Sequence, residues 1–213
     1  YDNCYAAELL LFAKNLAGQQ ERSAEQIELA VGEAVFLAYE PGRKRRRAEE
    51  MLQKLKSQLV GADDPSLHGA VHSGLGYAAA LGGKWNQVYP HFQAAQQAYQ
   101  LSDRFQGLEI SHNHYAEAIA LFQTGQLRLL AQRTGDLRCE GTTSADQFML
   151  TLSTLGFASA GFLINDAVDD MQKARKQLSQ QLGPIGNKGF SFLMQLHFAL
   201  GNLYQRDVYR AFT

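Results

Sequence analysis

The sequence predicts an all-α fold, a right-handed α-solenoid of stacked antiparallel helical hairpins, from three observations. No stretch shows the two-residue alternation of apolar and polar side chains that indicates a half-buried strand. Apolar residues instead recur at helical spacing along the chain. Residues 67–132 also contain an internal repeat: a helix rich in small residues, then glycine, then a helix opened by Trp85 or, 42 residues later, by Leu127. A repeat of this size is typical of stacked helical hairpins.

Turn signals divide the chain into a series of helices. The hairpin turns are expected at Pro41–Gly42, Gly82–Gly83, Gly125, Gly161 and about Gln205, in steps of roughly 36 to 44 residues. The expected helices cover residues 4–17, 23–39, 43–59, 66–81, 85–99, 108–122, 127–132, 148–160, 165–182 and 190–204, with another beginning at 208.

Several local features of these helices carry specific expectations. Ser66 is the expected N-cap of its helix, and Trp85 is expected to be buried against that helix. Pro90 predicts either a helix that begins near residue 87 or a kink, because proline lacks the amide proton. Residues 133–136 and 183–189 are expected to be turns, with an N-cap at Asn165. Residues 190–204 are apolar all round, which predicts burial on two sides.

Composition places the chain among ordinary folded proteins. Its 213 residues are 46% apolar and 19% charged, with a net charge of −1, so the whole molecule has no general attraction for nucleic acid or an anionic membrane. No apolar run approaches the ~20 residues that a membrane-spanning helix needs. Cys4 and Cys139 carry no motif, which favours free thiols in a reducing, cytoplasmic compartment.

We expect residues 1–213 to form one helical-repeat domain that is a piece of a longer polypeptide. The chain begins with Tyr1, and its last residues break off inside an apolar helical pattern. The runs of apolar residues at 9–12 and 208–212 cannot be covered by a single neighbouring helix. They therefore predict self-association through exposed repeat ends.

Short motifs between residues 82 and 137 resemble known helical repeats. They are Gly82-Gly83-Lys84-Trp85 followed by Phe92, Ala95 and Tyr99, then Arg104 to Glu109, Gly125 to Leu127, and Arg133 to Leu137. This pattern resembles tetratricopeptide-like repeats, in particular the C-terminal repeat region of large bacterial serine/threonine kinase/ATPase signalling proteins. The resemblance covers residues 74–212. Leu108, where that family tends to carry tryptophan, and Pro90 depart from it.

The run Arg43-Lys44-Arg45-Arg46-Arg47 is the most unusual local feature. Cations are disfavoured at the start of a helix, so an anionic partner is one explanation. The alternative is a solvated turn neutralised by nearby glutamates. Five consecutive residues wrap the whole helix rather than forming a stripe, which favours the solvated turn.

No other group of residues predicts a catalytic, cofactor or metal site. His68 and His72 lie four apart on one helix but lack a third ligand, and His112 and His114 face different ways. Residues 183–189 resemble a phosphate loop only superficially, because the GxxxxGK[ST] spacing is missing. We therefore expect no catalytic residues, no cofactor and no enzymatic activity.

Two classes of function remain. The first is a protein-interaction or intramolecular regulatory scaffold within a larger bacterial signalling protein, whose partner is a protein, a peptide or another domain of the same polypeptide. The second is a nucleic-acid or anion-binding module that uses residues 43–47. We favour the first and expect neither a nucleic-acid nor a membrane partner. A salt titration separates them, because phosphate contacts weaken steeply with salt.

Overall fold

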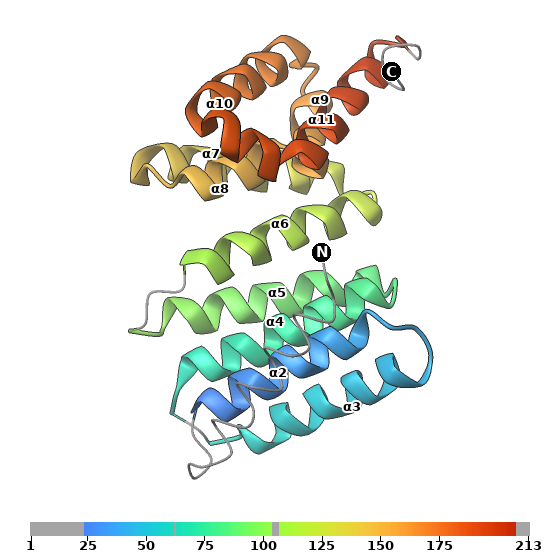
Figure 1. Ribbon diagram of the computed structural model, residues 1–213, viewed down its shortest axis with the longest axis vertical. Coiled ribbons are helices and arrows are strands. Elements are labelled where there is room, and N and C mark those ends of the chain that lie inside the picture. Colours follow the sequence, from blue (N-terminus) through green and yellow to red (C-terminus); the bar gives the residue numbers. More distant parts are fainter. Residues whose placement is uncertain (1–23, 62, 104–106, 208–213) are drawn as a thin grey trace. The chain divides into compact units, whose positions relative to one another are not determined.

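The computed structural model describes residues 24–61, 63–103 and 107–207, which are helical and contain no strand (Figure 1). The all-α prediction is confirmed. The chain divides into two compact units, residues 1–106 and 107–213, and each is described by itself. The expected apolar ends at 9–12 and 208–212 and the helix expected at 4–17 lie outside the described residues.

Unit 1 contains two helical hairpins whose helices run side by side (Figure 1). The helices are α2 (Ala24–Ala38), α3 (Arg43–Gln58), α4 (Pro65–Leu81) and α5 (Trp85–Gln100). Helix α4 packs against each of the other three, and α2 packs against α3. The expected turns are confirmed at Gly42 and Gly83, whose positive φ of 82° and 71° suits glycine.

The small residues of α4 allow its neighbours to approach closely. A methyl group added at Gly76 would lie 2.9 Å from the ring of Phe92, and one at Gly74 would lie 2.8 Å from Leu52. Both contacts are too short for a real side chain. The glycines lower the helix propensity of α4, but they allow side chains of α3 and α5 to pack directly against its backbone.

The start of α4 differs from the expectation. Asp64, not Ser66, is the N-cap: its carboxylate accepts hydrogen bonds from the Ser66 amide (2.9 Å) and hydroxyl (2.6 Å). Pro65 occupies the first helical position, where its missing amide proton costs nothing. This arrangement moves the cap two residues upstream.

Helix α5 begins at Trp85, not near residue 87, and contains Pro90 in its interior. Pro90 is exposed, so its ring lies on the outer side of the helix. Trp85 is half-buried rather than buried, because it lies in the first turn, at the edge of the hairpin. The expectation of full burial was wrong.

Unit 2 begins with α6 (Gly107–Gln123) and α7 (Leu127–Ser144). Helix α7 continues through residues 133–136, which were expected to form a turn. Leu130, Thr134 and Leu137 are all buried at helical spacing, and this stripe keeps the chain helical despite Gly135. The helix ends at Ala145, which has a left-handed conformation (φ 56°).

The next segment is broken earlier than expected. Helix α8 (Gln147–Thr154) is followed by the 3₁₀ turn η1 (Gly156–Ser159) and by α9 (Ala160–Ile164). The break falls at Gly156, where φ is 61°, whereas Gly161 is helical and buried against α7. The chain turns where the backbone needs positive φ, and Gly161 provides close packing instead.

The last two helices are α10 (Val168–Gly189) and α11 (Ser191–Tyr204). Ala167, not Asn165, is the N-cap of α10. Residues 183–189 are not a loop: the helix kinks at Gly183 (φ 63°, ψ −171°) and resumes at Pro184, whose fixed φ suits a first helical position.

Helix α11 is not buried on two sides. Phe192 is 69% exposed and Tyr204 is 46% exposed, whereas His197, Gly201 and Asn202 are buried. These buried polar and small residues face the other helices of unit 2. The His197 ring nitrogens contact the carbonyl oxygens of Thr154 (3.3 Å) and Met171 (3.2 Å).

Among the helices of the described ranges, no single one is both long and apolar enough to cross a bilayer. The helix pair Gln147–Thr154 and Gly156–Ile164, which is bent by 67°, reaches the length and apolar content of a membrane-spanning segment when its two parts are taken together.

Candidate functional site

A groove of about 240 Å³ lies between α3, α4 and α5 of unit 1. Its floor is apolar and comes from Leu75, Ala78 and Ala79 of α4. Its walls are polar and comprise Glu49, Gln53, Lys84, Gln87 and His91. Ala78 and Ala79 have short side chains, and both are buried at the bottom of the groove.

Helical spacing explains how the walls are built. Glu49 and Gln53 lie four residues apart on α3, and Gln87 and His91 lie four apart on α5, so each pair shares one helix face. These residues flank the apolar stripes, since Gln53 follows Leu52 on α3 and His91 precedes Phe92 on α5, and Leu52 and Phe92 are fully buried against α4.

An ion pair forms part of the groove wall. The Lys84 ammonium donates to both carboxylate oxygens of Glu49, at 2.7 and 2.8 Å. Both side chains are partly exposed, so the pair contributes little to stability. It does neutralise the wall, which leaves the amides of Gln53 and Gln87 to supply uncharged hydrogen-bonding groups.

His91 of the groove wall contacts a second histidine, His72 of α4. The Nδ1 atoms of His72 and His91 lie 3.4 Å apart, with ring centroids 5.6 Å apart and planes tilted by 46°. Burial lowers the pKa of His72 to about 4, with Lys56, His91 and His68 adding to the effect. Burial, and then Lys56, also lowers the pKa of His91. Both rings are therefore neutral at pH 7.

The spacing of His68 and His72 did not predict a metal site, and the histidine that contacts His72 is His91 on the next helix. His72 and His91 lie at nearly equal distances in sequence on either side of the Gly82–Gly83 turn. In an antiparallel hairpin such residues lie abreast. This symmetry was the signal that could have identified the pair.

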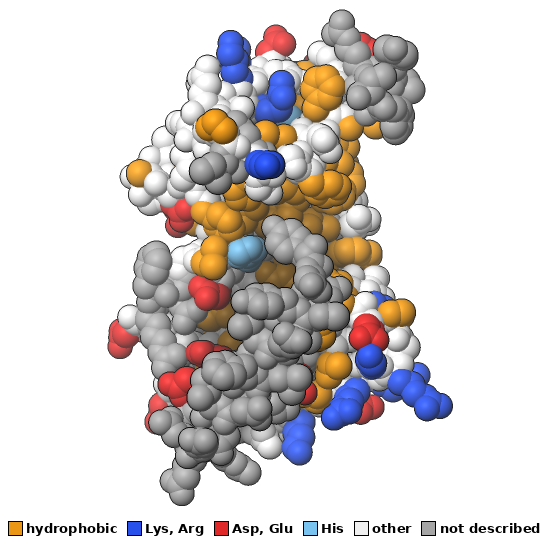
Figure 2. Space-filling model, in the orientation of Figure 1, with side chains coloured by type: hydrophobic (Ala, Val, Ile, Leu, Met, Phe, Trp, Pro, Cys, Tyr) orange, Lys and Arg blue, Asp and Glu red, His pale blue; other side chains and the backbone are white. Residues whose placement is uncertain are grey.

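The basic run forms the first turn and a half of α3, where Figure 2 shows Lys and Arg side chains gathered. Lys44 pairs with Glu40 at 2.5 Å, and the Arg45 Nε donates to the Ala38 carbonyl oxygen at 2.9 Å. Arg43, Arg46 and Arg47 are exposed. Lys44 is thus in an ion pair and Arg45 in a hydrogen bond across the α2–α3 turn, while the other three side chains of the run face solvent.

We expect replacement of Arg46 and Arg47 by glutamine to change the free energy of unfolding by less than about 1 kcal/mol, because both side chains are solvated. Adding Arg45→Gln should cost about 1 kcal/mol more, because the bond to Ala38 is lost. Chemical denaturation measures both effects. A gel-shift with mixed-sequence duplex at physiological salt should show no binding; micromolar binding that the triple variant abolishes would contradict this interpretation.

The other candidates remain separate from the groove. His112 is exposed and bonds the Leu108 carbonyl, while His114 lies 3.5 Å from the carboxylate of Glu117. Cys139 is an exposed free thiol, and Cys4 lies outside the described residues. Within residues 24–61, 63–103 and 107–207, no three His, Cys, Asp or Glu side chains are grouped to hold a metal.

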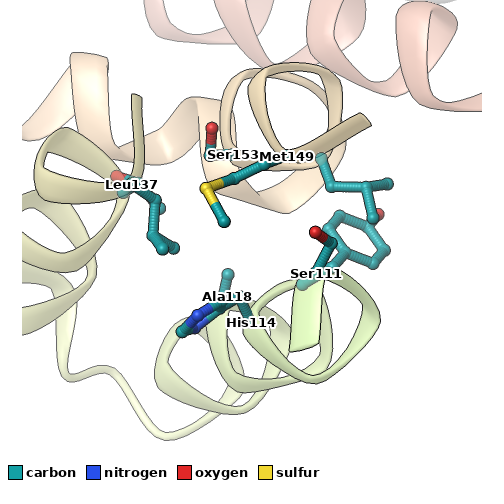
Figure 3. Close-up of a pocket in the computed structure, with 9 residues that line it drawn as sticks. Ser111, His114, Ala118, Leu137, Met149 and Ser153 are labelled. Atoms are coloured by element: carbon teal, nitrogen blue, oxygen red, sulfur yellow. The ribbon is translucent and has the colours of Figure 1, made fainter. Parts of the chain in front are cut away.

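Unit 2 contains a small internal cavity of about 10 Å³ (Figure 3). Ser111, His114 and Ala118 of α6, Leu137 of α7, and Met149 and Ser153 of α8 surround it. This volume is close to that of one water molecule, so the cavity is too small for an organic ligand.

Comparison with protein-family models, with curated proteins and with solved structures gives no match for this chain. An apolar floor between amide-bearing walls can bind an extended chain.

Proposed function

We propose that this chain is a non-catalytic protein-interaction scaffold that holds an extended peptide segment in the α3–α4–α5 groove. The observation that supports the proposal is the combination of an apolar floor on α4 with amide walls on α3 and α5. Fixed polar groups in the walls of such a groove orient the bound chain.

The chemistry of the walls favours a peptide over a charged ligand. Glutamine amides both donate and accept hydrogen bonds, as peptide N–H and C=O groups require, so Gln53 and Gln87 can pair with a bound backbone. The Glu49–Lys84 ion pair leaves the nearby wall without net charge. Binding should therefore depend only weakly on salt.

We also infer that the hairpins α2–α3 and α4–α5 are successive repeats of a right-handed, tetratricopeptide-like α-solenoid. In support, α2 packs against α4 as well as against its own partner α3. The resemblance noted in the sequence further suggests a cytoplasmic role inside a larger bacterial signalling protein. The peptide would then come from a separate protein or from another domain of the same polypeptide.

The proposal is tested by selecting random peptides on the 213-residue chain and measuring their affinity by fluorescence anisotropy. Gln87→Trp places a bulky ring in the groove, and we expect it to weaken the selected peptides by about tenfold or more. Gln97→Trp is the matched control, because Gln97 is exposed on the same helix and does not line the groove. It should change affinity less than twofold.

Two results would contradict the proposal. One is that no peptide is enriched, or that the enriched peptides bind Gln87→Trp as well as the parent. The other is a steep loss of affinity with salt, which would indicate contacts to an anionic ligand rather than an apolar groove.

A further inference from the structure

The small cavity of unit 2 is lined by a buried hydroxyl group that lacks a protein partner. Ser111 of α6 is 1% exposed, and among the described residues no group forms a hydrogen bond with its Oγ atom. Figure 3 shows Ser111 at the edge of the cavity. Buried polar side chains in folded proteins nearly always pair with a protein group or with an ordered water, because an unpaired one loses its hydration without compensation.

The cavity has the size and the chemistry to hold a single water. Its volume of about 10 Å³ is at the lower limit for one water molecule. Thr134 of α7 and Ser153 of α8 line it together with Ser111. Thr134 donates to the Leu130 carbonyl oxygen at 2.8 Å, and Ser153 donates to the Leu150 carbonyl oxygen at 3.3 Å. A hydroxyl oxygen that donates its proton can still accept a hydrogen bond.

We propose that this cavity binds one water molecule, which accepts the Ser111 proton and donates its own protons to the hydroxyl groups of α7 and α8. Buried waters typically make about three such bonds. Ala118 of α6 and Met149 of α8 also line the cavity, so the water lies where these two helices pack together. The site belongs to unit 2 and does not rest on peptide binding in unit 1.

A dry cavity is the alternative, because Ala118, Leu137, Met149 and Leu152 make much of the lining apolar. The two cases predict opposite effects of Ser111→Ala on stability. If the hydroxyl binds water, its removal should lower the ratio of folded to unfolded chain about fivefold, the loss of one hydrogen bond. If the hydroxyl is unpaired in a dry cavity, its removal should raise that ratio.

Urea unfolding followed by circular dichroism measures this change. Ser57→Ala is the matched control, because Ser57 is an exposed serine within α3. It reports the gain that alanine brings to any helix through its higher helix propensity, and the effect of Ser111→Ala is taken relative to it.

The direct test is water–protein cross-relaxation NMR on the 213-residue chain labelled at its methionine methyl groups. The Met149 side chain reaches into the cavity, so its methyl group should show a cross-peak to a long-lived water (Figure 3). Met171 is fully buried but does not line the cavity, and its methyl group should show none. Ser111→Val fills the space with an apolar group and should abolish the Met149 cross-peak while circular dichroism shows that the helices are retained.

Four results would overturn the proposal. The first is the absence of a water cross-peak at Met149 in the parent chain. The second is a cross-peak that persists in Ser111→Val, since it would then come from another exchanging hydroxyl proton. The third is a gain of stability in Ser111→Ala relative to Ser57→Ala. The fourth is a shift of the Met149 methyl signal under xenon pressure without a water cross-peak, which would assign a dry, apolar cavity.

Discussion

Replacement of Phe92 by alanine is expected to lower the free energy of unfolding of unit 1 by roughly 3–5 kcal/mol, the range for large buried aromatics. The Phe92 side chain is fully buried and meets the Tyr77 ring edge-on, with centroids 5.0 Å apart. It also occupies the space that Gly76 leaves on α4. Chemical denaturation followed by the fluorescence of Trp85, the chain's one tryptophan, measures the loss in this unit.

Two further variants show whether the loss arises from this packing. Gln97→Ala removes an exposed side chain from the same helix and should change stability by less than about 0.5 kcal/mol. Trp85→Ala, followed by circular dichroism, should cost less than Phe92→Ala because Trp85 is half-buried. A loss below about 1 kcal/mol for Phe92→Ala would show that α4 and α5 do not pack as described.

The helices of unit 1 could be predicted because several local signals coincide there. The turns at Gly42 and Gly83 need positive φ, and glycine stands at both positions between clear apolar stripes. The stripe of α5, which contains Val88, Phe92 and Ala95, is buried as its spacing predicts. Where turn chemistry and periodicity agree, the helix ends follow from the sequence.

In unit 2 the same signals disagreed, and tertiary packing decided between them. Gly135 was expected to end a helix but lies within α7, because its neighbours Leu130, Thr134 and Leu137 are buried together. Gly156 was not expected to break a helix but does so. A glycine permits a turn without requiring one, so its role depends on contacts that a single sequence does not contain.

The candidate site was largely beyond prediction for a related reason. Glu49 and Lys84 are 35 residues apart, and His72 and His91 are 19 apart. Their meeting depends on which faces of three helices turn toward one another. Residues 43–47 stood out in the sequence because they are contiguous. The groove did not, since each helix contributes only two or three ordinary residues to it.

Unit 2 contains a buried ion pair whose energetics differ from those of the surface pair in the groove. The Glu117 side chain is 2% exposed, and the Arg133 guanidinium reaches its two carboxylate oxygens at 3.0 and 3.4 Å. His114 lies 3.5 Å from the same carboxylate. Removing water from a carboxylate costs several kcal/mol, which only close partners offset.

Arg133→Met should therefore destabilise unit 2 by roughly 3–5 kcal/mol, because a carboxylate stays buried without its main counter-charge. Methionine keeps much of the side-chain volume, so the loss reports charge rather than packing. Chemical denaturation followed by circular dichroism measures it. The decisive comparison is the double variant Glu117→Gln/Arg133→Met, which removes both charges and should recover part of the lost stability. If the double variant is less stable than Arg133→Met by the full cost of Glu117→Gln alone, the two residues are not coupled and the buried-charge explanation is wrong.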